Sequence, residues 1–206
     1  MKDGTDPQRP DPQRPDPQRL KEDTVLSETL CGHTLHFHTT WGLFSPKQID
    51  DGSHLLLSQV SPPLTGEMLD MGCGYGTLGL GLARQAPQAQ VELVDKDFVA
   101  VDYAAANAQR NGLKNCRAYL SNGFSHVEGR CFDLIVSNLP AKVGRELLHI
   151  IILDAYDHLK PGGRLCVVTI SGLRQFIRRG FEEVFGNYDK LKQGRTHTVA
   201  QAVRQP

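Results

Sequence analysis

Apolar runs and helical patterns alternate along the chain from Glu67 onward. Segments with apolar residues at helical spacing lie between short apolar runs that turn residues delimit. The pattern predicts strands at 67–71, 90–95, 115–120, 132–137, 164–170, 187–193 and 197–203. It predicts helices at 77–86, 98–111, 144–159 and 172–184. Regular alternation of this kind indicates an α/β fold with a mostly parallel sheet and helices on both faces.

Turn and capping residues support these boundaries. Asp97 is the predicted N-cap of the helix over 98–111, and Gly112 follows its end. Pro161-Gly162-Gly163 is expected to stop the helix over 144–159. The last two predicted strands follow each other without a helix, so we expect them to form an antiparallel pair at one edge of the sheet.

The N-terminal part has a different organisation. Residues 6–19 repeat the pentad Asp-Pro-Gln-Arg-Pro and contain no apolar side chain, which predicts disorder or an extended polyproline-like tail over 1–22. A hairpin is expected over Thr24–Thr40, with Gly32 at its turn. A short helix with Asp50 or Asp51 as N-cap should follow. We therefore divide the chain into a tail (1–22), a hairpin and helix extension (23–60) and a main domain (61–206).

Composition narrows the possible functions. The 23 basic residues equal the 23 acidic ones, so bulk charge does not indicate a nucleic-acid binder. Residues 174–204 nevertheless hold seven Lys or Arg against three acids, which could follow an RNA backbone or be a solvated edge. Five scattered cysteines predict a cytoplasmic protein with reduced thiols, and no apolar run is long enough to span a membrane.

A glycine-rich loop joins the strand at 67–71 to the next helix. Its sequence is Asp70-Met71-Gly72-Cys73-Gly74-Tyr75-Gly76. Glycines at such a place let the backbone approach a ligand and leave amides free at a helix N-terminus. The segment from Gly74 to Gly79 also matches the dinucleotide fingerprint G-x-G-x-x-G, with Asp95 about twenty residues on, which would suggest NAD(P). Asp70 and the late start of that match argue against NAD(P).

Polar residues follow the next strands at their carboxyl ends. Asp95 ends the strand at 90–95, Asn122-Gly123-Phe124 follows the strand at 115–120, and Asn138-Leu139-Pro140-Ala141-Lys142 follows the strand at 132–137. Ligands bind at the carboxyl ends of strands in sheets of this type. These segments are therefore the candidate binding site.

Four elements in this order resemble the small methyltransferase domain, the catalytic unit of ribosomal-RNA guanine-N2 methyltransferases. They are Phe44-Ser45, Asp50-Asp51-Gly52, the loop from Asp70 to Gly76, and Asn138-Leu139-Pro140-Ala141. The resemblance covers the chain from about residue 35 onward. It implies a seven-stranded class I methyltransferase sheet, Rossmann-like, with an antiparallel edge pair and a hairpin extension.

The resemblance also implies S-adenosylmethionine as cofactor and ribosomal RNA as partner. Asp95 would accept from the ribose hydroxyls, Asp70 would orient the loop, and Asn122 and Gly123 would meet the adenine, with Phe124 beside it. The cofactor-binding candidates are Asp70, Gly72, Cys73, Gly74, Gly76, Asp95, Lys96, Asn122, Gly123 and Asn138. The catalytic candidates are Asn138, Leu139 and Pro140, and the substrate-binding candidates are Phe44, Ser45 and Lys142.

Two positions depart from the family pattern. Leu139 replaces its first proline, and Ala141 replaces an aromatic residue that stacks on the target base. Phe44, Trp41 or Tyr75 could supply the missing ring. A protein amide or small-molecule acceptor, an NAD(P)-linked enzyme and a non-catalytic cofactor-binding module stay open as alternatives. The cluster Cys31-x-His33-x-x-His36-x-His38 fits no standard zinc spacing, so no metal is expected.

Overall fold

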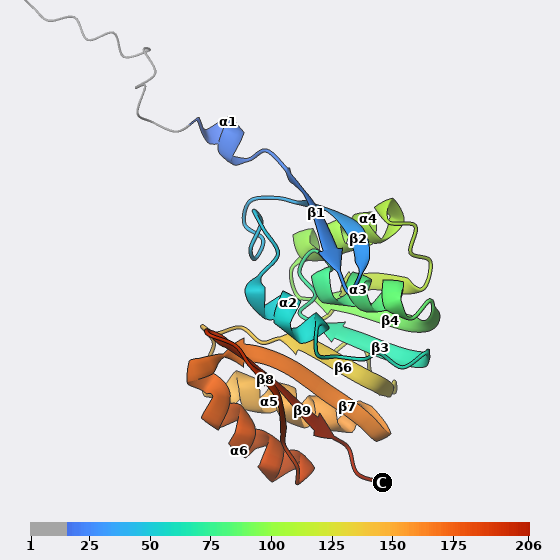
Figure 1. The fold of residues 1–206 in the computed structure, drawn as a ribbon, viewed down its shortest axis with the longest axis vertical. Helices are drawn as coiled ribbons and strands as arrows, with labels where there is room; N and C mark the ends of the chain where they lie inside the picture. Colours follow the sequence, from blue (N-terminus) through green and yellow to red (C-terminus); the bar gives the residue numbers. More distant parts are fainter. Residues whose placement is uncertain (1–15) are drawn as a thin grey trace, which may run out of the picture.

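A computed structural model describes residues 16–206 as one seven-stranded sheet with helices on both faces and a separate two-stranded hairpin (Figure 1). The strand order is β5-β4-β3-β6-β7-β9-β8. Neighbours from β5 to β7 are parallel, whereas β9 is antiparallel to both β7 and β8. The strands are β3 (Thr65–Met71), β4 (Gln88–Asp95), β5 (Cys116–Leu120), β6 (Phe132–Asn138), β7 (Leu159–Ile170), β8 (Asp189–Gln193) and β9 (His197–Val203).

Two hydrophobic clusters cover the two faces of the sheet. One contains buried residues of α2 (Asp51–Leu57), α3 (Thr77–Gln85) and α4 (Phe98–Arg110), and the other contains those of α5 (Arg145–Asp157) and α6 (Arg174–Phe185). Alternate residues of each strand enter the two clusters, as Met68 and Leu69 do in β3. The predicted fold class, with its antiparallel edge pair, is confirmed.

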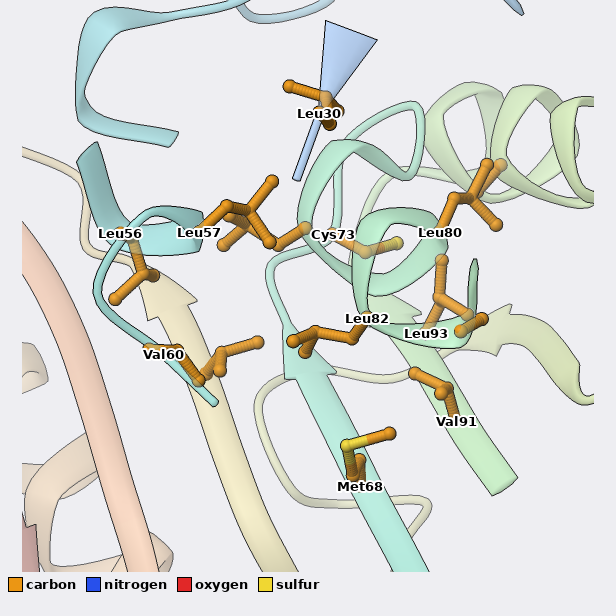
Figure 2. Packing of buried hydrophobic residues seen from close by; sticks show 14 of the residues in the cluster. Leu30, Leu56, Leu57, Val60, Met68, Cys73, Leu80, Leu82, Val91 and Leu93 are labelled. Atoms are coloured by element: carbon orange, nitrogen blue, oxygen red, sulfur yellow. The ribbon is translucent and has the colours of Figure 1, made fainter. Parts of the chain in front are cut away.

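The hairpin of β1 (Thr24–Leu30) and β2 (His33–Thr39) shares the first of these clusters. Figure 2 shows Leu30 of β1 and Leu56 and Leu57 of α2 in one cluster with Leu80 and Leu82 of α3. The extension over 23–60 is therefore packed into the same core as the main sheet. The division into three parts remains a prediction.

Asn107 of α4 and Asn111, the C-cap residue of that helix, attach β2 to the main domain. Asn107 accepts from the His38 amide at 2.8 Å and donates to the His38 carbonyl at 2.9 Å. Asn111, one helical turn later, makes the same pair of bonds with His36, at 2.9 and 2.7 Å. The two side chains thus satisfy the free edge of β2 as another strand would. Asn107 also donates to the Tyr75 carbonyl at 3.0 Å, which links the hairpin to the glycine loop.

Most predicted boundaries lie within two residues of the observed ones, with two differences. Pro161-Gly162-Gly163 lies inside β7 rather than before it, because the strand bulges between Leu159 and Arg164 and exchanges backbone hydrogen bonds with Arg204 there. Pro17–Leu20 form one helical turn, α1, that Asp16 caps, within the predicted unstructured tail. The repeat before Asp16 lies outside the described residues.

Neither a membrane span nor a metal-binding group is found among residues 16–206. No helix there is long and apolar enough to cross a membrane. No group of three or more His, Cys, Asp or Glu in the same range could hold a metal ion.

Candidate functional site

Three of the predicted site segments meet because β3 lies between β4 and β6. All three strands are parallel, so their carboxyl ends point to the same edge of the sheet. The glycine loop, Asp95 and Asn138 follow or end these strands, and the chain crosses from one side of β3 to the other at this place. Such a topological switch point is where open α/β sheets bind ligands.

The glycine loop runs along the end of β4. The amides of Gly72 and Cys73 both donate to the Val94 carbonyl, at 2.8 and 3.0 Å. Gly72 and Gly74 have φ of 74° and 54°, and a Cβ at either would meet no atom within 4 Å. These two positions therefore offer bare backbone to a ligand. Burial, and the carboxylates of Asp70 and Asp95, raise the pKa of the Cys73 thiol well above its ordinary value, so Cys73 is no nucleophile at neutral pH.

Asp70 lies beneath this loop and is fully buried. Its Oδ2 accepts from the Gly79 amide of α3 at 2.7 Å. A Cβ at Gly79 would lie 2.6 Å from Leu93 Cγ and 3.0 Å from Asp70 Oδ2, so only glycine permits this approach. Burial raises the pKa of Asp70 to about 7, with the Gly79 hydrogen bond opposing and the Asp95 charge adding to the rise. Its Oδ1 is buried and has no hydrogen-bond partner among the described residues.

Asp95 connects the loop to the start of α4. Its Oδ2 accepts from the Gly74 amide at 2.9 Å, and its Oδ1 accepts from the Asp97 amide at 3.0 Å. Lys96 beside it is exposed. Asp97 caps α4 through the Val99 amide, as predicted. The carboxylate of Asp95 is therefore held at the rim of the loop by backbone amides.

The segment after β5 is only partly as predicted. Asn122 is exposed, and its backbone N–H donates to Ser125 Oγ at 3.2 Å. Gly123 follows with φ of 58°. Phe124, by contrast, is 3% exposed and packs on the His158 ring, with centroids 4.9 Å apart. The expectation that Phe124 flanks a ligand is wrong, because this ring belongs to the core between the sheet and α5.

Asn138, at the end of β6, is held by the start of α2. Its Nδ2 donates to Asp50 Oδ2 at 2.8 Å and to Ser53 Oγ at 3.0 Å. A carboxylate only accepts hydrogen bonds, so the amide nitrogen must face Asp50, and the carbonyl oxygen must point the other way. Both side-chain protons are thus used, and Asn138 presents an acceptor.

Asp50 is a candidate site residue whose contact with Asn138 the sequence did not reveal. It was expected only as a possible N-cap, and it does cap α2, because Oδ2 also accepts from the Ser53 amide at 3.2 Å. One oxygen therefore serves the helix and Asn138 together. The Asp-x-Gly element of the family pattern was the signal, but its link to Asn138 lies 88 positions away in the chain.

The residues after Asn138 differ in exposure. Leu139 is buried, and its amide donates to the Val168 carbonyl at 3.0 Å. Pro140, Ala141 and Lys142 are exposed. The side chain of Leu139 therefore belongs to the core, and only its backbone is placed to act beside Asn138.

The loop before Asp50 rests on the glycine loop. Tyr75 donates from its hydroxyl to the Ser45 carbonyl at 3.2 Å, and the Ser45 hydroxyl donates to the Gln48 carbonyl at 2.6 Å. Tyr75 is buried against Phe37, and Trp41 lies under the Lys21 ammonium, 5.8 Å from its ring centroid. Phe44 is 66% exposed. Trp41 is 58% exposed, so the rings of both Trp41 and Phe44 are accessible, and Phe44 is the more exposed of the two.

Comparisons with known proteins identify a family for most of the chain. The model of the methyltransferase small domain matches residues 34–201. The uncharacterized protein YbxB of Bacillus subtilis is 37% identical over 170 residues, which are 81% of this chain and 84% of that protein. Ribosomal RNA small subunit methyltransferase C of Hamiltonella defensa is 38% identical over 78% of this chain but only 48% of its own length.

A solved structure extends the likeness to the fold. The chain is similar to the Thermus thermophilus 16S rRNA N2 G1207 methyltransferase, solved in complex with AdoMet and guanosine. The TM-score is 0.80, the identity 29%, and the match covers 89% of this chain and 51% of the other. The chain thus spans about half the length of the ribosomal-RNA methyltransferases that it matches. The extent of the family match, together with the likeness to YbxB, shows that this chain belongs to the methyltransferase small domain family and is a methyltransferase.

Proposed function

We propose that the chain is an S-adenosylmethionine-dependent N-methyltransferase that acts on the exocyclic amine of a guanine in ribosomal RNA. The observation that carries the proposal is the orientation of Asn138, whose amide protons are bound by Asp50 and Ser53. Its oxygen is thereby left to accept a hydrogen bond from an amine. A planar amine attached to a nucleobase is a substrate that needs such an acceptor.

The residues of the glycine loop fit the cofactor. Open space at Gly72 and Gly74, the buried unpartnered oxygen of Asp70 and the carboxylate of Asp95 form a set of backbone and anionic groups at one edge. Asp95 suits ribose hydroxyls, and Asp70 suits the cationic amino group of the methionine part. Cys73, Gly76, Lys96, Asn122 and Gly123 complete the proposed cofactor-binding set. When bound, S-adenosylmethionine supplies an electrophilic methyl group on its sulfonium.

The chain's own residues position the acceptor. The nitrogen lone pair of guanine N2 is delocalised into the ring and is a weak nucleophile. When Asn138 Oδ1 and the Leu139 carbonyl accept its two hydrogens, the nitrogen is held and its lone pair is directed outward. Catalysis then consists of positioning and electrostatic orientation, with no covalent enzyme intermediate. The proton becomes acidic on methylation and leaves to water.

Phe44 is the proposed stacking residue for the base. Ala141 cannot stack and Tyr75 is buried, whereas Trp41, although 58% exposed, already has the Lys21 ammonium 5.8 Å from its ring centroid. The Ser45 hydroxyl is used within the loop, so Ser45 supports Phe44 rather than touching the substrate. Exposed Pro140 and Lys142 lie next to Asn138 and Leu139 in the chain, where they would border the acceptor.

Transfer of a tritiated methyl group tests the proposal. Wild-type protein should label ribosomal RNA, and nucleoside analysis should find N2-methylguanosine. Asn138→Ala should abolish transfer while calorimetry shows that S-adenosylhomocysteine is still bound. Label in protein or small molecules but not in RNA would refute the acceptor. Binding of NAD without binding of S-adenosylhomocysteine would refute the cofactor, and cofactor binding without any transfer would indicate a non-catalytic module.

A further inference from the structure

A basic hollow lies between the first turns of α6 and the edge strand β8. It has a volume of about 280 Å³ and is lined by Arg174, Gln175, Arg178, Tyr188 and Lys190. Three of these five side chains are cations, and they come from two different elements. The chain as a whole carries no net charge, so this concentration is local.

The positive charge of the basic hollow is only partly compensated. Arg178 pairs with Glu182 at 2.8 Å and lies over the Tyr188 ring, 5.9 Å from its centroid. Arg174 donates to the neutral side chain of Gln193 at 3.1 Å. Among residues 16–206, neither Arg174 nor Lys190 has a carboxylate within ion-pair distance. Asp189 is the other acid near Tyr188, so a net positive charge faces solvent here.

The strand register places Lys192, two residues beyond Lys190 of the basic hollow, in line with Asn138. Asn138 pairs with Val168 of β7, Val168 pairs with Val199 of β9, and Val199 pairs with Lys192 of β8. Three steps of about 4.8 Å put Lys192 about 14 Å from Asn138 along one row of the sheet. Arg195, exposed in the turn between β8 and β9, lies at the same carboxyl edge.

A cation-rich edge strand has another common explanation. Lysines on an edge strand prevent pairing with a second sheet, and this accounts for Lys190 and Lys192 alone. It does not account for Arg174 and Arg178, which converge on Lys190 from a helix. Cations brought together from two elements repel one another, and an anion between them removes that repulsion.

We propose that the basic hollow binds phosphate groups of the RNA strand that carries the acceptor guanine, a few nucleotides from that base. The inference rests on the proposed function. Arg174 and Lys190 make the ionic contacts, because Arg178 is already paired. Lys192 lies in the same row as Asn138 and Arg195 lies at the same carboxyl edge, so both can contact a backbone that runs from Asn138 around the edge strand to the basic hollow.

Salt-dependent binding of a labelled single-stranded RNA of 12 nucleotides tests the proposal. The slope of log Kobs against log [KCl] is negative, and each lost phosphate contact should reduce its magnitude by about 0.7 for a single strand. Lys190→Gln should show this change, and Arg174→Gln/Lys190→Gln should show about twice as much. Lys114→Gln is the matched control, because Lys114 is exposed and precedes β5 at the opposite edge of the sheet. Equal slopes for Lys190→Gln and Lys114→Gln would overturn the proposal.

Two further measurements separate this proposal from the proposed function. Methylation of free guanosine, which has no phosphate, should proceed at the wild-type rate in the double variant. If wild-type protein methylates no RNA or guanosine, the proposed function fails, while the salt slopes still decide the basic hollow. Inorganic phosphate at constant ionic strength should not raise the melting temperature. A rise that the double variant abolishes, with unchanged RNA slopes, would assign the basic hollow to free phosphate and overturn the RNA contact.

Discussion

Replacement of Asp50 tests whether methyl transfer depends on the orientation of Asn138. Asp50→Ser keeps a good N-cap for α2, because serine caps helices as well as aspartate does. Its hydroxyl is one bond shorter, so it cannot reach the Asn138 amide, which Asp50 contacts at 2.8 Å. Asp50→Asn keeps both bonds, because a single oxygen of Asp50 accepts from Asn138 and from Ser53.

The structure gives the expected size of the effect. A hydrogen bond to a charged group contributes about 1.5–3 kcal/mol, and about 1.4 kcal/mol is a factor of ten. Without this bond the Asn138 amide can rotate and present donors to an amine that itself donates. We therefore expect Asp50→Ser to lower kcat about 10- to 100-fold. Asp50→Asn retains a neutral bond, weaker by about 1 kcal/mol, and should lower kcat only about fivefold.

Steady-state methyl transfer at saturating RNA and cofactor gives kcat, and calorimetry with S-adenosylhomocysteine gives the cofactor affinity. Both variants should bind the cofactor as the wild type does and should unfold at similar temperatures. Wild-type kcat in Asp50→Ser would refute the orientation argument. Equal losses in Asp50→Ser and Asp50→Asn would show that the charge of Asp50 matters and the geometry does not.

Three other substitutions probe the cofactor side, the hairpin and the substrate loop. Folding raises the pKa of Asp70 to about 7. The protonated carboxyl therefore stabilises the folded state fully below the unfolded pKa near 4, and this stabilisation is lost as the pH rises through 7. The total loss in the free energy of unfolding is about 4 kcal/mol. Asp70→Asn should therefore flatten the urea stability profile between pH 4 and 7 and weaken cofactor binding; an unchanged profile would contradict the titration of Asp70. Asn107→Ala leaves backbone groups of His38 and Tyr75 unpaired and should lower the free energy of unfolding in urea by about 3 kcal/mol. Asn111→Ala, at the more exposed end of β2, should lower it less, and equal losses would argue against the importance of the bond from Asn107 to Tyr75. Phe44→Leu should raise KM for RNA about tenfold through lost stacking, with Trp41→Leu as the control; an unchanged KM would place the stacking ring elsewhere.

The sequence by itself determined the elements of this protein and the place of its glycine loop. Helix periodicity, apolar strand runs and capping residues such as Asp97 act over a few positions, so they can be interpreted without the fold. The Asp70–Gly76 loop and the strand ends at Asp95 and Asn138 were found in the same way. The edge pair also followed from local information, because no helix separates its strands.

The tertiary structure decided which of these residues act together. Asp50 and Asn138 are 88 positions apart, and Asn107 and His38 are 69 apart, so their hydrogen bonds exist only because packing brings α2 and β2 to the sheet. Phe124 follows a strand end in sequence, yet packing against His158 buries it. The basic hollow likewise requires α6 to lie beside β8. Local patterns specify backbone geometry over one turn or strand, whereas side-chain partners depend on contacts between segments that the sequence does not place side by side.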